Sequence, residues 1–235
     1  MSGTSWLLAI DTATTTVVVA AGTTDGRLLA AETFEGRYRH SQELLPAVVR
    51  LMDRAGLRLA ELAGVVVGTG PGAFTGLRVG LATAKTLAHE LDVPVVGVPT
   101  SAALLAEAAD RAADRGAILW LPSGPRDRVA VVAGAPPAIV RAGEVAPEQV
   151  RRAAARPGVV ELAVDLDGRA PEAALAEGRA AVQQLPGALL ELGAARLAAG
   201  ERDAPERLVP QYAVAPRGAR TAEQEGGVAW SRDPR

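Results

Sequence analysis

The order of strand-like and helix-like segments in the first half of the chain constrains its fold most. Three runs of apolar and β-branched residues come first, and a turn sequence, TDG, separates the second from the third. Helical and strand-like runs then alternate. The strand-like runs are 6–13, 14–22, 27–34, 64–70 and 93–98, and the helical runs are 41–56, 75–91 and 101–114. A meander followed by parallel crossovers predicts an α/β fold with a mixed five-stranded sheet covered by helices on both faces.

The second half of the chain has weaker patterns. GAILWLP and DRVAVVAG predict two strands around the turn SGPR, and GVVELAVD predicts a third. Residues 186–200 are rich in Ala and Leu and predict a helix. The end of the chain is polar and rich in Pro, Gly and Arg. We therefore expect an N-terminal lobe over 1–108, a smaller C-terminal lobe over 109–205 and a partly disordered tail over 206–235.

Composition excludes several classes of function. The chain has no cysteine, which excludes disulfides, a thiolate nucleophile and cysteine-ligated metals. Its formal net charge of −2 provides no basic field for a polyanion, so direct binding of nucleic acid is not expected. The start of the chain has no basic leader, and no apolar run approaches the roughly 18 residues of a membrane span. We therefore expect a cytoplasmic protein that does not associate with membranes.

The segment GTGPGAFTGLRVG, residues 68–80, could either cradle a phosphate or bring two backbones together. It fails as a Walker A loop because Leu-Arg follows Gly76 where Lys and Ser or Thr are needed. It is also a poor dinucleotide fingerprint, because it follows the fourth strand and no acidic residue ends the next one. The spacing of Gly76, Gly80 and Ala84 leaves one helix face almost bare. Either another part of this chain or a partner protein can pack there.

Asp11, at the end of the first strand, is the best candidate for a catalytic or magnesium-bound carboxylate. Thr12 and the threonines that follow could contact a phosphate. The alternative is a turn in which the Asp and Thr side chains satisfy their own backbone. The only histidines, His40 and His89, lie on different predicted helices without metal-ligand spacing, and no G-x-S-x-G motif is present. A metal site built on these histidines, or a serine hydrolase, is therefore not expected.

Four segments together resemble one protein family. They are LLAIDTATTTVVVAAG, RHSQELLPAV, GVVVGTGPGAFTGLRVGLATAKTLA and VPVVGVPTSAALLAEA. They are similar to the N-terminal domain of the TsaB (YeaZ) family, bacterial proteins of tRNA threonylcarbamoyladenosine synthesis. The resemblance is close over 7–108, whereas later sequence matches only through the last helix and PQYAVAPR. It implies an actin-like (ASKHA) fold with two RNase H-like lobes, each a mixed sheet flanked by helices.

The resemblance also implies a role without catalysis. TsaB is related to TsaD, which transfers a threonylcarbamoyl group to the adenosine beside the anticodon and binds its metal partly through His-x-x-x-His. Thr100 and Leu104 stand at those histidine positions here. The implied protein has no catalytic residue, metal or cofactor of its own. It pairs with TsaD, or with itself when alone, works with the ATPase TsaE and meets tRNA only through the complex. ATP at the TsaD interface stays an open alternative.

In this family the first two helices form the contact with the partner. The resemblance therefore implies that residues 41–55 and 75–90 form this contact here. Our hypothesis is that the bare glycine face packs against the partner, with larger apolar side chains beside it. The expected interface residues are His40, Leu44, Leu45, Val48, Met52, Phe74, Gly76, Leu77, Gly80, Leu81 and Ala84.

The sequence departs from the family pattern at one loop, and a second function stays open. Where the family has Asp-Ala-Arg-Arg and then Glu-Val-Tyr at the start of the second lobe, this chain has Pro122–Gly124 and Ala130. The family role of that loop at the cleft between the lobes is therefore not carried over. The alternative function is a small ATP-dependent phosphotransferase of the same superfamily that uses Asp11 and the threonines on Mg-ATP. A peptidase lacks a nucleophile and a base.

Overall fold

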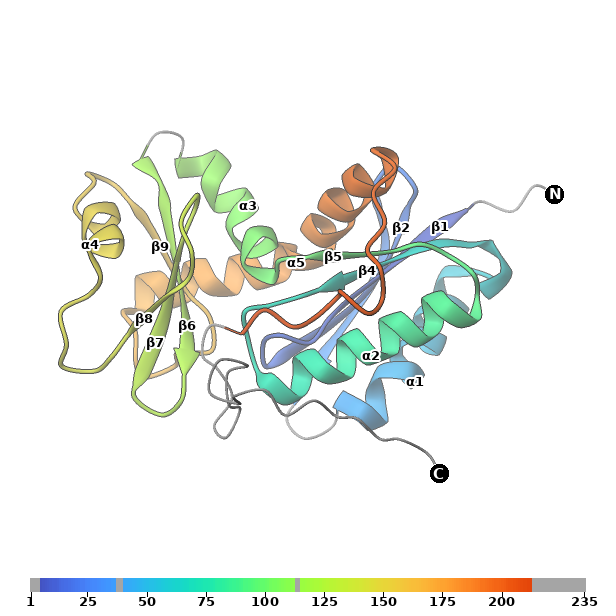
Figure 1. The fold of residues 1–235 in the computed structure, drawn as a ribbon, viewed down its shortest axis with the longest axis horizontal. Helices are drawn as coiled ribbons and strands as arrows, with labels where there is room; N and C mark the ends of the chain where they lie inside the picture. Colours follow the sequence, from blue (N-terminus) through green and yellow to red (C-terminus); the bar gives the residue numbers. More distant parts are fainter. Residues whose placement is uncertain (1–4, 37–39, 113–114, 213–235) are drawn as a thin grey trace, which may run out of the picture.

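The computed structural model describes residues 5–36, 40–112 and 115–212, which form two lobes (Figure 1). The N-terminal lobe is built on a five-stranded sheet of order β3-β2-β1-β4-β5. Central β1 pairs antiparallel with β2 and parallel with β4, which confirms the predicted mixed sheet. The strands are β1 (Trp6–Asp11), β2 (Thr16–Thr23), β3 (Leu28–Glu35), β4 (Leu62–Gly68) and β5 (Val95–Val98). The helices are α1 (His40–Ala55), α2 (Phe74–Glu90), α3 (Thr100–Ala112) and the short 3-10 turn η1 (Leu59–Glu61).

Strand β1 explains why this sheet is covered on both faces. All of its side chains are buried, and they alternate between two separate clusters. Trp6, Leu8 and Ile10 pack with residues of α1 and α2 on one face. Leu7 and Ala9 face the other side and pack with α3 and with the long last helix (Figure 1).

The C-terminal lobe has a four-stranded sheet of order β8-β7-β6-β9. Its elements are β6 (Ala117–Ser123), β7 (Asp127–Val132), β8 (Ala138–Val140), α4 (Glu148–Ala154), β9 (Val160–Ala163) and α5 (Glu172–Ala198). The sequence patterns missed β8 and α4, which are too short for periodicity to reveal. They also placed the start of the last helix at Pro186, whereas α5 begins at Glu172 and carries that proline inside it. The helix begins before Pro186 because most of the residues that precede this proline are strong helix formers.

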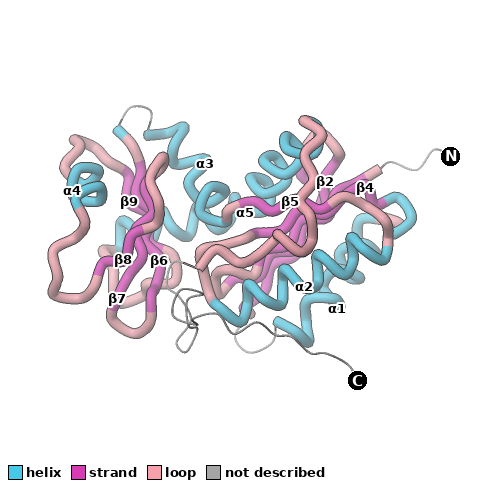
Figure 2. The backbone as a smooth tube through the Cα atoms, viewed as in Figure 1, coloured by secondary structure: helices cyan, strands magenta, loops and turns pink. Residues whose placement is uncertain are grey.

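Helix α5 holds the two lobes together (Figure 2). Gly178 brings the helix so close to β9 that a Cβ there would lie 1.9 Å from the carbonyl oxygen of Ala163. Further along, a Cβ on Gly193 would lie 2.3 Å from Val66 in β4. Although α5 is 27 residues long, neither it nor any other helix in the described part of the chain is long and apolar enough to cross a membrane.

After α5 the chain returns to the N-terminal lobe. The first part of the expected tail, 206–212, lies beside β4 and β5, and Leu208 is buried in the lobe's core. The rest of that tail, 213–235, lies outside the described residues, as do 1–4, 37–39 and 113–114.

Candidate functional site

Asp11 lies fully buried where β1, the glycine-rich loop and α3 meet. The hydroxyl of Thr100, at the start of α3, donates a 2.6 Å hydrogen bond to Oδ2 of Asp11. The backbone N–H of Ala13 donates to Oδ1 at 2.8 Å. Thr100 Oγ1 also accepts the N–H of Gly70 at 3.0 Å. Both carboxylate oxygens are thus used inside the chain, which favours the interpretation of Asp11 as a structural turn residue.

The glycine-rich loop needs its glycines because other groups press against their Cα atoms. A Cβ on Gly68 would lie 1.7 Å from Oδ2 of Asp11, and one on Gly72 would lie 2.1 Å from the carbonyl oxygen of Ala13. The loop therefore brings two stretches of backbone together, and its glycines are explained without a phosphate.

The bare face of α2 is also occupied from within the chain. Thr12 Oγ1 donates a 2.8 Å hydrogen bond to the carbonyl oxygen of Gly76. A Cβ on Gly80 would lie 2.2 Å from the same hydroxyl oxygen, and Ala84 is fully buried. These contacts favour internal packing of this face over contact with a partner protein, which stays a prediction.

Most of the other expected interface residues lie in the core of the N-terminal lobe. The buried ones are Leu44, Val48, Leu77 and Leu81. Met52 is half-buried, and the side chain of His40 lies outside the described part of the chain. Among the expected interface residues whose side chains the structure describes, Leu45 is 50% exposed and Phe74 is 38% exposed. Val49, which is 56% exposed one turn after Leu45, was missed, although its i+4 spacing from Leu45 was visible in the sequence.

The two positions that correspond to the metal-binding histidines of TsaD are buried as well. The Thr100 hydroxyl is committed to Asp11 and Gly70, and Leu104 belongs to the hydrophobic core between the lobes. These residues do not fit a metal ion. Within the described ranges, no three histidine or carboxylate side chains gather closely enough to hold a metal ion.

Burial raises the pKa of Asp11 to about 6, although the hydrogen bonds from Thr100 and Ala13 act to lower it. A carboxylate whose pKa is higher in the folded than in the unfolded chain favours folding most when it is protonated. This contribution is complete below about pH 4, the range of the unfolded pKa, and is lost as the pH rises through 6. Ionised Asp11 therefore destabilises the fold at neutral pH.

We expect Asp11→Asn to remove this pH dependence. The amide oxygen can still accept the Ala13 N–H and the NH₂ can donate to Thr100 Oγ1, although the Thr100 hydroxyl hydrogen then loses its acceptor. Between pH 4 and pH 7, the free energy of unfolding of the wild type should fall relative to that of the variant by about 2 kcal/mol. Urea unfolding of both proteins across this range measures the difference. Parallel curves would contradict a buried, ionising Asp11.

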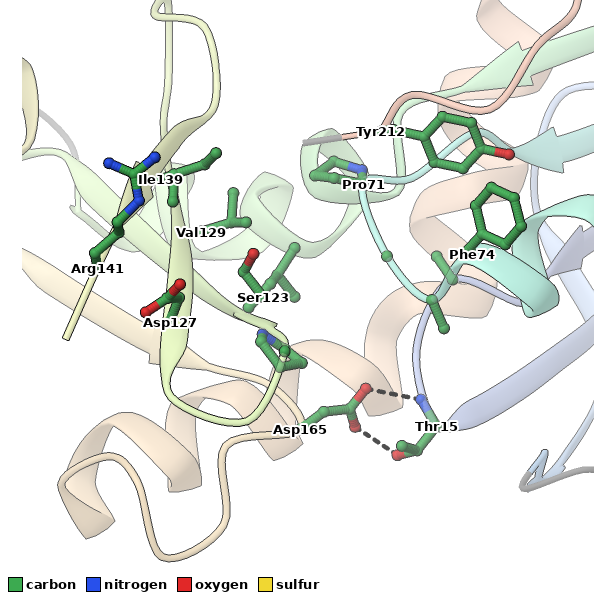
Figure 3. A pocket seen from close by; sticks show the side chains of 16 residues that line it. Thr15, Pro71, Phe74, Ser123, Asp127, Val129, Ile139, Arg141, Asp165 and Tyr212 are labelled. Carbon is green, nitrogen blue, oxygen red and sulfur yellow. Dashed lines mark hydrogen bonds between the residues drawn. The ribbon is translucent and has the colours of Figure 1, made fainter. Parts of the chain in front are cut away.

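A cleft of about 830 Å³ separates the lobes (Figure 3). Phe74, Pro71 and Tyr212 line it on the N-terminal side, and strands β6 to β8 line it on the other. The residues lining it from those strands include Ser123, Asp127, Val129, Ile139 and Arg141.

Two hydrogen bonds cross this cleft between the lobes. The backbone N–H and hydroxyl of Thr15 donate to the carboxylate of Asp165 at 2.8 and 2.5 Å (Figure 3). The sequence analysis did not identify this contact, because the two residues are 150 positions apart. Asp165 lies just after β9 and has a φ of 56°. The Thr15–Asp165 bonds fix the distance between the lobes at this point.

The loop that departs from the family pattern forms the β6–β7 hairpin on the rim of the cleft. Gly124 takes up the positive φ of its turn. Arg169 donates hydrogen bonds to the carbonyl oxygens of Gly124 at 3.0 Å and Pro125 at 3.1 Å. The hairpin is therefore held by a guanidinium group that binds its backbone carbonyls.

Comparison with known proteins identifies a matching family model and several relatives. The family model of TsaD, tRNA N6-adenosine threonylcarbamoyltransferase, matches 35–188. Proteins named tRNA threonylcarbamoyladenosine biosynthesis protein TsaB are 36% identical over 106 residues in Bacillus subtilis and 38% identical over 94 residues in Escherichia coli. The aligned stretches cover 43% and 40% of this chain, and the same shares of those two relatives, so the chain matches less than half of their length.

The solved structure of YeaZ from Pseudomonas aeruginosa is similar over almost its whole length. It superposes with a TM-score of 0.64 at 26% identity, covering 88% of this chain and 99% of YeaZ. This agreement extends the likeness into the C-terminal lobe, where the sequence resemblance is weak. The chain therefore belongs to the TsaB (YeaZ) family, with a domain of the threonylcarbamoyltransferase type and the actin-like fold expected for it.

Proposed function

We propose that this protein takes part in the synthesis of threonylcarbamoyladenosine in tRNA as a non-catalytic partner of TsaD. The names of the B. subtilis and E. coli relatives support the pathway, and the match to the TsaD family model supports a partner of related fold. In this proposal TsaE joins the complex, and this protein contacts tRNA only as part of that complex. In the absence of TsaD, the protein forms a homodimer. Whether ATP lies at the TsaD interface is left to experiment.

The observation that carries the proposal is the exposed apolar surface of α1 and α2, two helices that contact each other. Leu45 and Val49 are half exposed and lie one turn apart on α1, and Phe74 begins α2. Exposed large apolar side chains on neighbouring helices of a soluble protein can contribute to an interaction surface. We call Leu45, Val49 and Phe74 the α1/α2 surface. It replaces the glycine face as the proposed contact with TsaD.

The alternative, an ATP-dependent phosphotransferase that uses Asp11, has less support. Phosphoryl transfer needs carboxylate oxygens that can reach magnesium or the attacking hydroxyl. Those of Asp11 have no exposed surface and already accept hydrogen bonds from Thr100 and Ala13. ATP turnover by the isolated chain that Asp11→Asn abolishes would bring this alternative forward.

The test is to mix the purified chain with TsaD from the same organism. Light scattering after size exclusion measures the mass of the complex, and threonylcarbamoylation of tRNA is assayed with each chain alone and with both, in the presence of TsaE and ATP. We expect a one-to-one complex and activity that requires both chains. If the two chains do not associate under any of these conditions, the proposal is wrong.

A further inference from the structure

The chain between 201 and 212, which we call the strap, lies along the open edge of β5. β5 is the last strand of its sheet, and its other edge pairs with β4. Asp203 binds one carbonyl oxygen and one N–H on this open edge of β5. Its own N–H donates to Val95 O at 2.9 Å, and its carboxylate accepts the Gly97 N–H at 2.7 Å. Near the end of the strap, the Gln211 N–H donates to Thr69 O at 2.8 Å. The strap thus covers an edge that could otherwise pair with another strand.

A polar anchor holds the start of the strap. Arg196, in the last turns of α5, donates hydrogen bonds to both carboxylate oxygens of Asp203, at 2.9 and 3.1 Å. The same guanidinium donates to Gly97 O at 2.5 Å. Partial burial acts to raise the pKa of Asp203, but the hydrogen bonds from Arg196 and Gly97 outweigh it, and the pKa lies below its ordinary value. The carboxylate is therefore ionised and paired at neutral pH.

An apolar anchor holds the middle of the strap. Leu208 is only 5% exposed and packs into the core of the N-terminal lobe, whereas its neighbour Val209 is 58% exposed. Leu208 fits because Gly97 lies beneath it, where a Cβ would come within 2.5 Å of its Cδ1 atom.

The end of the strap forms part of the cleft wall. The ring of Tyr212 packs against that of Phe74 with centroids 5.0 Å apart, and both residues line the cleft (Figure 3). Arg78 lies over the Phe74 ring, 4.4 Å from its centroid. One aromatic pair therefore connects the strap, the first turn of α2 and the mouth of the cleft.

Few groups attach the strap, and the strand pairings of the N-terminal sheet do not involve it. No helix or strand lies between 201 and 212, and the five-stranded sheet keeps all its strand pairings if the strap leaves. Such weakly attached segments open locally before the rest of a fold does. We propose that the strap is a releasable closure, whose detachment removes the Tyr212 wall from the cleft and bares the edge of β5.

The absence of cysteine allows a clean test by thiol labelling. Thr69 lies beneath the strap, is 4% exposed, and its hydroxyl has no hydrogen-bond partner among the described residues, so Thr69→Cys sacrifices no hydrogen bond and removes only one methyl group. The labelling rate of Cys at this position reports opening of the strap. We expect Leu208→Ala to raise that rate at least tenfold, and the matched control Val209→Ala, an exposed change in the same segment, to leave it unchanged.

A second reporter separates strap release from unfolding of the lobe. Ala47, in α1, is fully buried in the same core and far from the strap in sequence, so Ala47→Cys reports opening of the lobe. Its labelling rate should not change with Leu208→Ala. Should Leu208→Ala fail to fold, Asp203→Asn, which weakens the polar anchor, must produce the same selective increase. An unchanged rate at position 69, or equal increases at 69 and 47, would overturn the proposal.

Discussion

Leucine in place of Gly80 is expected to unfold the N-terminal lobe before any effect on assembly can be measured. The first added carbon would lie 2.2 Å from the hydroxyl oxygen of Thr12, and the site is fully enclosed between α2 and the end of β1. Thr12 cannot move aside without losing its hydrogen bond to Gly76 O. Overpacking at a site with no free space should lower the free energy of unfolding by about 3 kcal/mol or more.

Ala82→Leu is the matched control, because Ala82 lies on the same helix but is exposed. It should change stability by no more than about 0.5 kcal/mol. Denaturant unfolding followed by circular dichroism measures both variants, and the fluorescence of buried Trp6 adds a probe inside the affected lobe. If Gly80→Leu keeps wild-type stability but no longer binds TsaD, then the glycine face does meet a partner and the packing against Thr12 is wrong.

The N-terminal sheet could be predicted because each of its signals is local. The apolar run of β1, the β-branched run of β2, the turn at Gly26 and the strand and helix runs that follow are all read within short windows. The spacing of Gly76 and Gly80 likewise indicated a bare helix face. The residue that covers that face cannot be identified from the nearby sequence, because Thr12 lies 64 positions before Gly76.

The role of Asp11 could not be predicted for the same reason. An aspartate at a strand end suits both a catalytic site and a turn, and the difference depends on which groups surround it. Here Gly68 and Thr100 enclose it, and they come from separate strand ends that meet only in the folded sheet. The strap was hidden in a polar, proline-containing segment whose single buried leucine, Leu208, gives no periodic signal.

The α1/α2 surface leads to the second prediction with a large expected effect. We expect the double variant Leu45→Glu/Val49→Glu to weaken the complex with TsaD by a factor of about 100 or more, while the free chain keeps its stability. Both side chains are half exposed in the isolated protein, so glutamate there meets water and costs the fold little. In a complex, two carboxylates would have to be buried against an apolar surface without partners.

Leu29→Glu is the control for this variant, since Leu29 is 40% exposed and belongs to β3, not to α1 or α2. Titration of TsaD with each variant measures the dissociation constant, and thermal unfolding of each free chain checks that its fold is intact. Loss of binding by the double variant alone would place TsaD on α1. Equal binding by all three proteins would remove the α1/α2 surface from the proposal and direct the search to the cleft and its strap. A change in the mass of the free chain would show that a second copy uses the same surface, because a shared contact must fail for both partners at once.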